Sequence, residues 1–292
     1  MTARGFSVIE LLMAAALVMA ISGALAALVA PLGTVIERAG ANADMDAGTR
    51  TAIQQVAADL RAAGSDAAIA LPGTRLARVL PPVVPLRDLE SGEVAVPATA
   101  IRVTSVPHLA AQGTLSVEAA AGNVWLPLET TSRCATGGPS CGFRPGQPAV
   151  LYTETTAHLA VIDGTAEGAV SLAPPLPAAF PAGAVLSELM TVTYGTRPGP
   201  DGSRRLVRIS SGGAEQPVLD NVVEFTATTD TANPLAAALL TWTLRVQAPS
   251  ADFRGPAGFL FRQGGTATQA RNWVPDVQVR MVVALRNREA AW

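Results

Sequence analysis

The chain has 292 residues, of which 49% are hydrophobic and 15% are charged, and its formal net charge is −2. This length supports a sizeable core and one or two domains. The apolar content excludes a disordered chain. The near-neutral charge gives no electrostatic case for nucleic-acid binding, so no nucleic-acid partner is expected.

The N-terminal segment predicts a membrane-spanning helix. From Leu11 to Ile36 the chain has 26 residues without a charged side chain, which exceeds the roughly 20 residues needed to cross a bilayer core. Arg4 precedes this run, and the segment after it is not strongly basic. The positive-inside tendency therefore places residues 1–5 in the cytoplasm and the bulk of the chain outside.

A carboxylate, Glu10, stands at the start of the apolar run. A charged side chain at this depth is costly and calls for a specific partner. An ordinary secretory signal has a shorter apolar stretch followed by a small-residue cleavage site. The plain alternative is a signal anchor in which this glutamate occurs by chance.

The hexapeptide Gly5-Phe6-Ser7-Val8-Ile9-Glu10 resembles the type IV prepilin (class III) signal. The resemblance implies that a membrane prepilin peptidase cuts between Gly5 and Phe6 and methylates the new amino group of Phe6. It also implies that Glu10 recognises the N-terminal amine of a neighbouring subunit during assembly. A buried carboxylate and a buried amine are each costly alone, and pairing them sets the register between subunits.

The helix is predicted to extend to residue 64. Pro31 and Gly33 predict a kink or local melting, because proline removes a hydrogen bond of the helix. The glycines within residues 39–48 leave the continuity of the helix open. Helical periodicity then returns as an apolar stripe, with charged residues such as Asp59 off the stripe and Gly64 as a C-terminal cap. The stripe consists of Ile53, Val56, Ala57 and Leu60.

The remainder of the chain is predicted to be rich in strands. Residues 65–99 have many prolines and glycines and predict a long irregular connection. Residues 191–194 and 206–209 flank a loop rich in Gly and Pro and predict a β-hairpin. Short β-rich runs between turn signals predict strands at 101–106, 114–117, 149–153, 159–162, 170–172, 186–194, 205–209, 222–227, 241–246 and 277–285.

One long N-terminal helix followed by antiparallel strands predicts an α+β fold with the helix packed on the sheet. This is also the pilin-like architecture that the resemblance implies. The expected division is a leader at 1–5, a transmembrane and assembly helix at 6–64, and a β-rich globular domain at 65–292. Residues 56–64, Tyr194 with Arg205–Arg208, and residues 217–225 are similar to PilW-type minor pilins and J-type pseudopilins. The similarity does not extend to residues 65–185.

No catalytic constellation, metal site or cofactor motif is found, so the chain is not expected to be an enzyme. His108 and His158 are the only histidines, and neither has a further ligand nearby in the sequence. Cys134 and Cys141 predict a small disulfide-closed loop in an oxidising compartment, with two unpaired thiols as the open alternative. Strand-like settings predict core positions for three tryptophans, Trp125, Trp242 and Trp273.

The resemblance implies a structural minor pilin that helps to start or assemble a type IV pilus. Its expected partners are prepilin peptidase, other minor and major pilins through the N-terminal helix, and the inner-membrane assembly platform. Its expected location is the inner membrane, with a cytoplasmic N-terminus and a periplasmic domain, and then the pilus or pseudopilus. The alternatives are a J-like pseudopilin of type II secretion, and an adhesin or binding module anchored by the pilin route.

Overall fold

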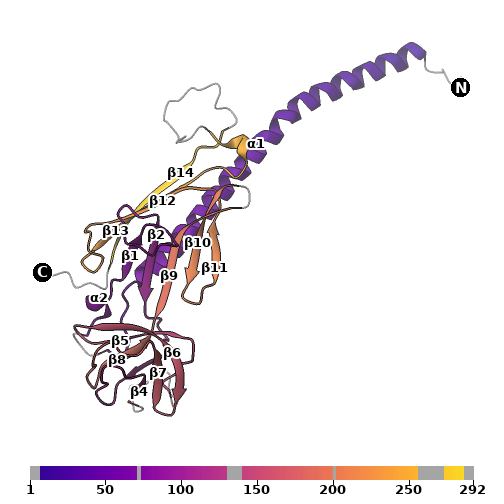
Figure 1. The fold of residues 1–292 in the computed structure, drawn as a ribbon. Helices are drawn as coiled ribbons and strands as arrows, with labels where there is room; N and C mark the ends of the chain where they lie inside the picture. Colours follow the sequence, from indigo (N-terminus) through magenta and orange to yellow (C-terminus); the bar gives the residue numbers. More distant parts are fainter. Residues whose placement is uncertain (1–6, 71–73, 130–139, 200–201, 256–272, 286–292) are drawn as a thin grey trace. The chain divides into compact units, whose positions relative to one another are not determined.

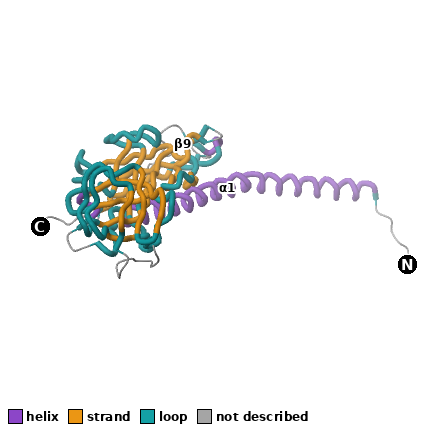
Figure 2. Tube along the Cα trace, turned by 60° about the horizontal axis from the view of Figure 1, so that its bottom comes forward, coloured by secondary structure: helices purple, strands orange, loops and turns teal. Residues whose placement is uncertain are grey.

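The structure of the protein is a computed structural model that describes residues 7–70, 74–129, 140–199, 202–255 and 273–285 (Figure 1). The chain divides into two compact units. One unit consists of residues 1–48 and 247–277, and the other consists of residues 49–246 and 278–292. The α+β class is confirmed, since one long N-terminal helix is followed by antiparallel sheets (Figure 2).

Helix α1 runs from Val8 to Ala62 without interruption. The local melting expected at Pro31 and Gly33 is not observed, and the glycines at 40 and 48 do not end the helix. A proline removes one hydrogen bond of the ladder, and cooperative propagation carries a long helix past a single defect. Gly64 follows the helix with φ 69°, as predicted for the cap, and its N–H donates to the Thr104 carbonyl at 2.8 Å.

The apolar stripe of α1 within residues 49–62 lies on the core of the larger unit, as predicted. Val56, Ala57 and Leu60 are almost fully buried, while Ile53 is half-buried. This stretch lies against a five-stranded antiparallel sheet of order β1-β2-β9-β10-β11. Its strands are β1 (Val83–Leu86), β2 (Ala100–Ser105), β9 (Met190–Pro198), β10 (Arg204–Ser210) and β11 (Glu215–Leu219).

A three-stranded sheet has the order β12-β13-β14. Its strands are β12 (Val222–Thr229), β13 (Leu239–Val246) and β14 (Val277–Ala284). Two backbone hydrogen bonds between Ala227 of β12 and Ala98, two residues before β2, join β12 to this segment. Trp242 of β13 is fully buried beside Phe225 of β12, with ring centroids 6.2 Å apart, so its predicted core position is correct.

The six-stranded sheet has the order β3-β8-β5-β6-β7-β4. It lies between β2 and β9 in the chain, and Ser105 and Met190, the ends of those two strands, are Cα partners in the five-stranded sheet. The chain therefore leaves and rejoins the first sheet at adjacent positions. The strands are β3 (Gln112–Thr114), β4 (Trp125–Pro127), β5 (Pro148–Tyr152), β6 (Ala157–Ala166), β7 (Ala169–Ala173) and β8 (Val185–Glu188).

The strand and core predictions need five corrections. The strand expected at 114–117 lies earlier, as β3 at Gln112–Thr114, and Leu115 forms only an isolated bridge with Leu128. Residues 65–99 are not wholly irregular, since they contain α2 (Leu76–Val79) and β1. Residues 186–194 hold two strands, β8 and β9, in two different sheets. Strands β4 and β11 were not predicted, because β4 has only three residues and β11 is mostly exposed. Trp125 is not a core residue, since 51% of it is exposed.

Candidate functional site

The described chain begins at Ser7, so the predicted cleavage and methylation positions, Gly5 and Phe6, lie outside the described residues. The next residues form a capping box at the start of α1. The Ser7 N–H donates to Glu10 Oε2 at 3.1 Å, and the Ile9 N–H donates to Ser7 Oγ at 3.3 Å. The Glu10 carboxylate thus satisfies a backbone donor of the first turn, where the helix dipole also favours a negative charge.

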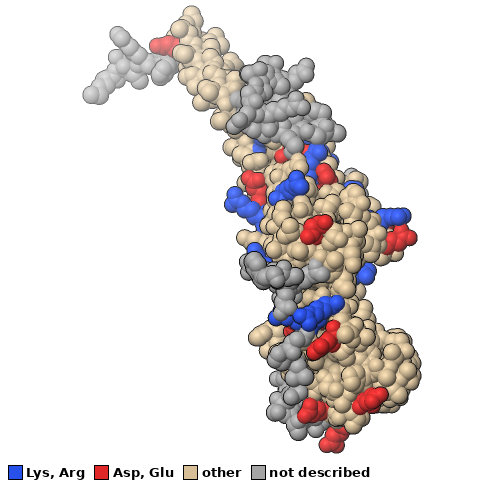
Figure 3. Space-filling model, turned by 90° about the vertical axis from the view of Figure 1, so that its left-hand side faces the viewer, with Lys and Arg blue, Asp and Glu red and all other residues tan. Residues whose placement is uncertain are grey.

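The stretch of α1 after Glu10 exposes large apolar side chains on all sides. Leu11, Leu17, Leu25 and Ile36, for example, are each more than half exposed. Figure 3 shows this stretch as uncharged surface with acidic colour at its N-terminal end. The helix is long and apolar enough to cross a membrane, a property typical of a membrane anchor and of a signal sequence.

At the other end of α1, three side chains from distant parts of the sequence form a polar network. Asp59 Oδ2 accepts a hydrogen bond from the Tyr194 hydroxyl of β9 at 2.7 Å and from Arg208 Nε of β10 at 2.9 Å. The Asp59 and Arg208 side chains are each 17% exposed. A charge-assisted pair this well covered is shielded from solvent and ties the helix to the sheet.

The network perturbs the ionisation of its members. Burial and the adjacent Asp59 carboxylate raise the pKa of Tyr194 above its ordinary value. For Arg208, burial acts to lower the pKa, but the hydrogen bond and charge of Asp59 outweigh burial and raise it. The phenol is therefore neutral and the guanidinium charged at physiological pH, as their roles as donors to Asp59 require.

These three residues belong to the two short segments on which the expected resemblance to PilW-type and J-type proteins depends. The helix-end segment contains Asp59, and the hairpin segment contains Tyr194 and Arg208. The sequence places Asp59 off the apolar stripe, and helical periodicity alone cannot distinguish an exposed carboxylate from one that meets a sheet. The available signal was that a Tyr and an Arg occur on paired strands, where Arg208 and Tyr194 are Cα partners.

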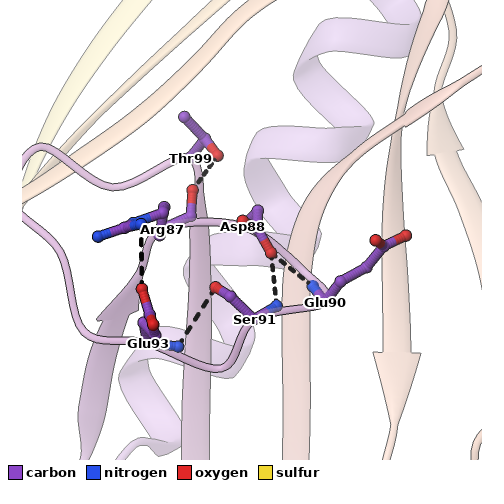
Figure 4. Close-up of polar contacts among 6 residues, drawn as sticks. All are labelled: Arg87, Asp88, Glu90, Ser91, Glu93 and Thr99. Atoms are coloured by element: carbon purple, nitrogen blue, oxygen red, sulfur yellow. Dashed lines mark hydrogen bonds and ion pairs between the residues drawn. The ribbon is translucent and has the colours of Figure 1, made fainter.

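Figure 4 shows a second polar cluster, in the loop that joins β1 to β2. Asp88 Oδ1 accepts from the N–H groups of Glu90 and Ser91 at 2.8 and 2.6 Å, which lowers the pKa of this exposed carboxyl. Arg87 pairs with Glu93 at 3.1 Å, and the Arg87 carbonyl accepts from the Thr99 hydroxyl. The carboxylates of Asp88 and Glu93 make their contacts within the loop, so these two residues shape a turn.

The same loop is fastened to β9 by two contacts. Arg197 pairs with Glu90 at 2.6 Å. The Leu89 side chain occupies the space above Gly195, where a Cβ atom would come within 2.5 Å of Leu89 Cγ. Gly195 therefore allows the loop to seat on the sheet.

The predicted cysteine loop is only partly within the described residues. Cys141 is disulfide-bonded and fully buried in the core of the six-stranded sheet. Cys134 lies outside the described residues, and the pairing of these two cysteines stays a prediction.

The two histidines lie in different environments. His108 is exposed, whereas His158 is buried with its Nε2 atom 3.4 Å from the Pro174 carbonyl oxygen. Across the part of the chain that the structure describes, no group of three or more His, Cys, Asp and Glu side chains is placed to hold a metal ion.

Comparison with known proteins found no family model and no curated protein that matches this chain. The expected likeness to type IV prepilins therefore depends on short sequence motifs alone. Of these motifs, the structure describes residues 7–10 at the start of α1 and the Asp59, Tyr194 and Arg208 contacts where α1 meets the five-stranded sheet.

Proposed function

We propose that the chain is a structural minor pilin of PilW type, which takes part in the initiation and assembly of a type IV pilus. The observation that carries this proposal is the N-terminal end of α1. It combines apolar side chains exposed on all sides with a single carboxylate, Glu10, in the first turn. No one face of a protein domain can cover such a helix, whereas a membrane or a bundle of similar helices can.

In this proposal, prepilin peptidase removes residues 1–5 and methylates Phe6. Before assembly, the subunit resides in the inner membrane with its N-terminus in the cytoplasm and its β-rich domain in the periplasm. The inner-membrane assembly platform then transfers it to the filament. There α1 packs laterally against the helices of other minor and major pilins, which replace the lipid around its apolar side chains.

Glu10 supplies the specificity of this packing. Its carboxylate accepts the Ser7 N–H in the single chain, and one carboxylate oxygen can accept further donors. The methylated amine of a neighbour's Phe6 provides a positive partner of the right chemistry. Because an unpaired charge among apolar helices is costly, subunits that align the amine with Glu10 are favoured over other registers.

The mature N-terminus, measured by mass spectrometry, tests the signal directly. We expect methylated Phe6 as the first residue, and Gly5→Ala to leave uncleaved protein in the inner membrane. A mature chain that starts elsewhere, or normal processing of Gly5→Ala, would overturn the assignment.

Incorporation into filaments tests the role of Glu10. Glu10→Ala should be cleaved normally and be depleted from sheared filaments. Glu37→Ala removes an exposed carboxylate from the same helix and is the matched control. Equal incorporation of the Glu10 and Glu37 variants would count against the pairing.

A J-like pseudopilin of type II secretion uses the same helix chemistry, and a deletion strain distinguishes the two. Loss of pili supports the proposal, whereas loss of secreted enzymes with normal pili supports the pseudopilin. The third candidate is a binding module or adhesin anchored by the pilin route. It is favoured by one observation, the separate six-stranded sheet with its own core between β2 and β9.

A further inference from the structure

One half of the outer face of the six-stranded sheet is apolar and open to solvent. Strand β6 alternates, with Ala160 and Ile162 directed into the core and Leu159 and Val161 on the opposite face. Leu159 is 51% exposed and Val161 is 42% exposed. Exposed apolar side chains that adjoin one another on a sheet are typical of an interaction surface.

The other half of the same face is already covered. Val150 and Tyr152 of β5 are fully buried in a second core with Ala67 and Leu76, from the segment that follows α1. Val150 is the Cα partner of Leu159 on β6. The cover therefore extends to Ala157 at the start of β6 and ends before Leu159. Beyond it, the same face continues over the rest of β6, β7 and β4, which are neighbours in the sheet (Figure 1).

Trp125 provides an aromatic platform on this open face. It is the Cα partner of Ser171 on β7, which is in turn the partner of Gly164 on β6. The indole Cη2 atom lies 3.8 Å from the position that a Cβ atom would have on Gly164, so the ring extends across β7. Ser171 beneath is only 5% exposed, whereas Trp125 is 51% exposed. One face of the indole therefore rests on the sheet and the other faces solvent.

The segment that forms this sheet is acidic in composition. Residues 106–189 contain six Asp and Glu residues and two Arg residues. Asp163 is exposed and is the extra residue of the β-bulge between Ile162 and Gly164, next to the glycine under the indole. The face of an indole is itself electron-rich. A cation held there gains from both the ring and the carboxylate.

We propose that this surface, made by Trp125, Leu159, Val161 and Asp163, docks an extended arginine-bearing segment of a partner polypeptide. The guanidinium stacks on the free face of Trp125 beside Asp163, and the apolar part of the segment lies along Val161 and Leu159. A planar guanidinium suits this site better than an ammonium, because it stacks on the ring and still donates to the carboxylate. The inference goes beyond the filament role and does not depend on it.

The test uses the full-length protein in a mild non-ionic detergent and a fluorescein-labelled peptide, Gly-Arg-Val-Arg-Val-Gly, followed by fluorescence anisotropy. We expect saturable binding that Trp125→Ala weakens about tenfold or more, since exposed aromatic anchors dominate such sites. Asp163→Asn should weaken binding about two- to fivefold. Glu154→Gln removes an exposed carboxylate from the β5–β6 turn and should leave binding unchanged.

Any of the following three outcomes would overturn the proposal. Equal affinity of the Trp125→Ala variant would exclude the platform. Equal binding of a peptide with citrulline in place of arginine would show an apolar partner without the cation. Binding of neutral oligosaccharides at Trp125, without binding of the arginine peptide, would show a carbohydrate site. Because Trp125 is half exposed, an unchanged thermal unfolding midpoint should confirm that its variant is folded.

Discussion

The two ends of α1 share one secondary structure but differ in how their side chains are covered. Residues 8–36 carry large apolar side chains that are exposed in every direction. Residues 49–62 carry fewer, yet Val56 and Leu60 are almost completely buried. The difference is one of arrangement, because a one-sided stripe fits a sheet and an all-round apolar surface fits no single protein face. Apolar content alone therefore does not tell where a helix will be buried.

The comparison predicts that truncating a leucine near the buried end of α1 lowers the free energy of unfolding most, whereas the same truncation near the exposed end does not. Leu60→Ala should lower the free energy of unfolding of the sheet-containing unit by about 2–5 kcal/mol, as expected for a buried leucine. Leu17→Ala, on the exposed stretch, should leave it unchanged. Thermal unfolding in detergent, followed by near-ultraviolet circular dichroism, measures both. Equal unfolding midpoints for the two variants would contradict the difference in burial between the two ends of α1.

A second prediction extends the comparison to the segment just past α1, where the Tyr152 hydroxyl accepts the Ala67 N–H at 3.3 Å. Burial raises the pKa of Tyr152 to about 12. Because the unfolded chain loses this proton near pH 10, stability should be constant below that pH. The free energy of unfolding should then fall by about 3 kcal/mol as the pH rises through about 12.

Urea unfolding at several alkaline pH values tests this slope. The Tyr152→Phe variant should lose part of this alkaline decrease in stability. The remaining part should come from Tyr194, whose pKa is also raised by burial. An identical alkaline profile for Tyr152→Phe and the unmodified protein would show that the phenol does not titrate with folding.

The polar contact between helix and sheet should have the next largest effect. Asp59→Asn removes the charge that pairs with Arg208 and should destabilise the unit by about 1–3 kcal/mol. Arg61→Gln, an exposed change two residues away, serves as the control and should have little effect. A double-mutant cycle with Arg208→Gln should give a coupling free energy clearly above zero. Additive effects would mean that the pair does not hold the helix.

The smallest effect is expected at the start of α1. Ser7→Ala removes the side chain that accepts the Ile9 N–H and should cost about 0.5–2 kcal/mol, confined to the first turn. Hydrogen exchange of the amides near residue 9 should become faster, with no change in the unfolding midpoint of the sheet-containing unit. A lowered midpoint would show that the first turn is coupled to the rest of the fold.

Several elements could be predicted because their signals are local. The apolar run, the stripe of Val56 and Leu60, and the cap at Gly64 depend on residues within a few turns of one another. The β9–β10 hairpin was predicted for the same reason, since its strands adjoin in sequence and pair antiparallel as expected. Strand β4 has only three residues and β11 is mostly exposed, so neither shows the alternation of apolar and polar residues that marks a half-buried strand.

The candidate functional residues also differ in whether the local sequence reveals them. Glu10 stands out in the sequence because a charge interrupts the start of an apolar run, and it caps the helix that the run forms. Asp59 has no such signal, since its partners are more than a hundred residues away. Trp125 was predicted to be in the core, because an aromatic residue in a strand is usually buried. Which side of a sheet is covered is not encoded in the strand itself.

The sequence by itself determined a long helix with an exposed apolar stretch, a carboxylate at its first turn and a one-sided stripe near its end. These properties follow from composition and period along one continuous segment. Only the tertiary structure decided that the strands within the described residues form three sheets, that Asp59 meets Tyr194 and Arg208, and that Trp125 faces solvent. Strand pairing and burial depend on contacts between residues far apart in the chain, and periodicity cannot specify which distant segment will supply them.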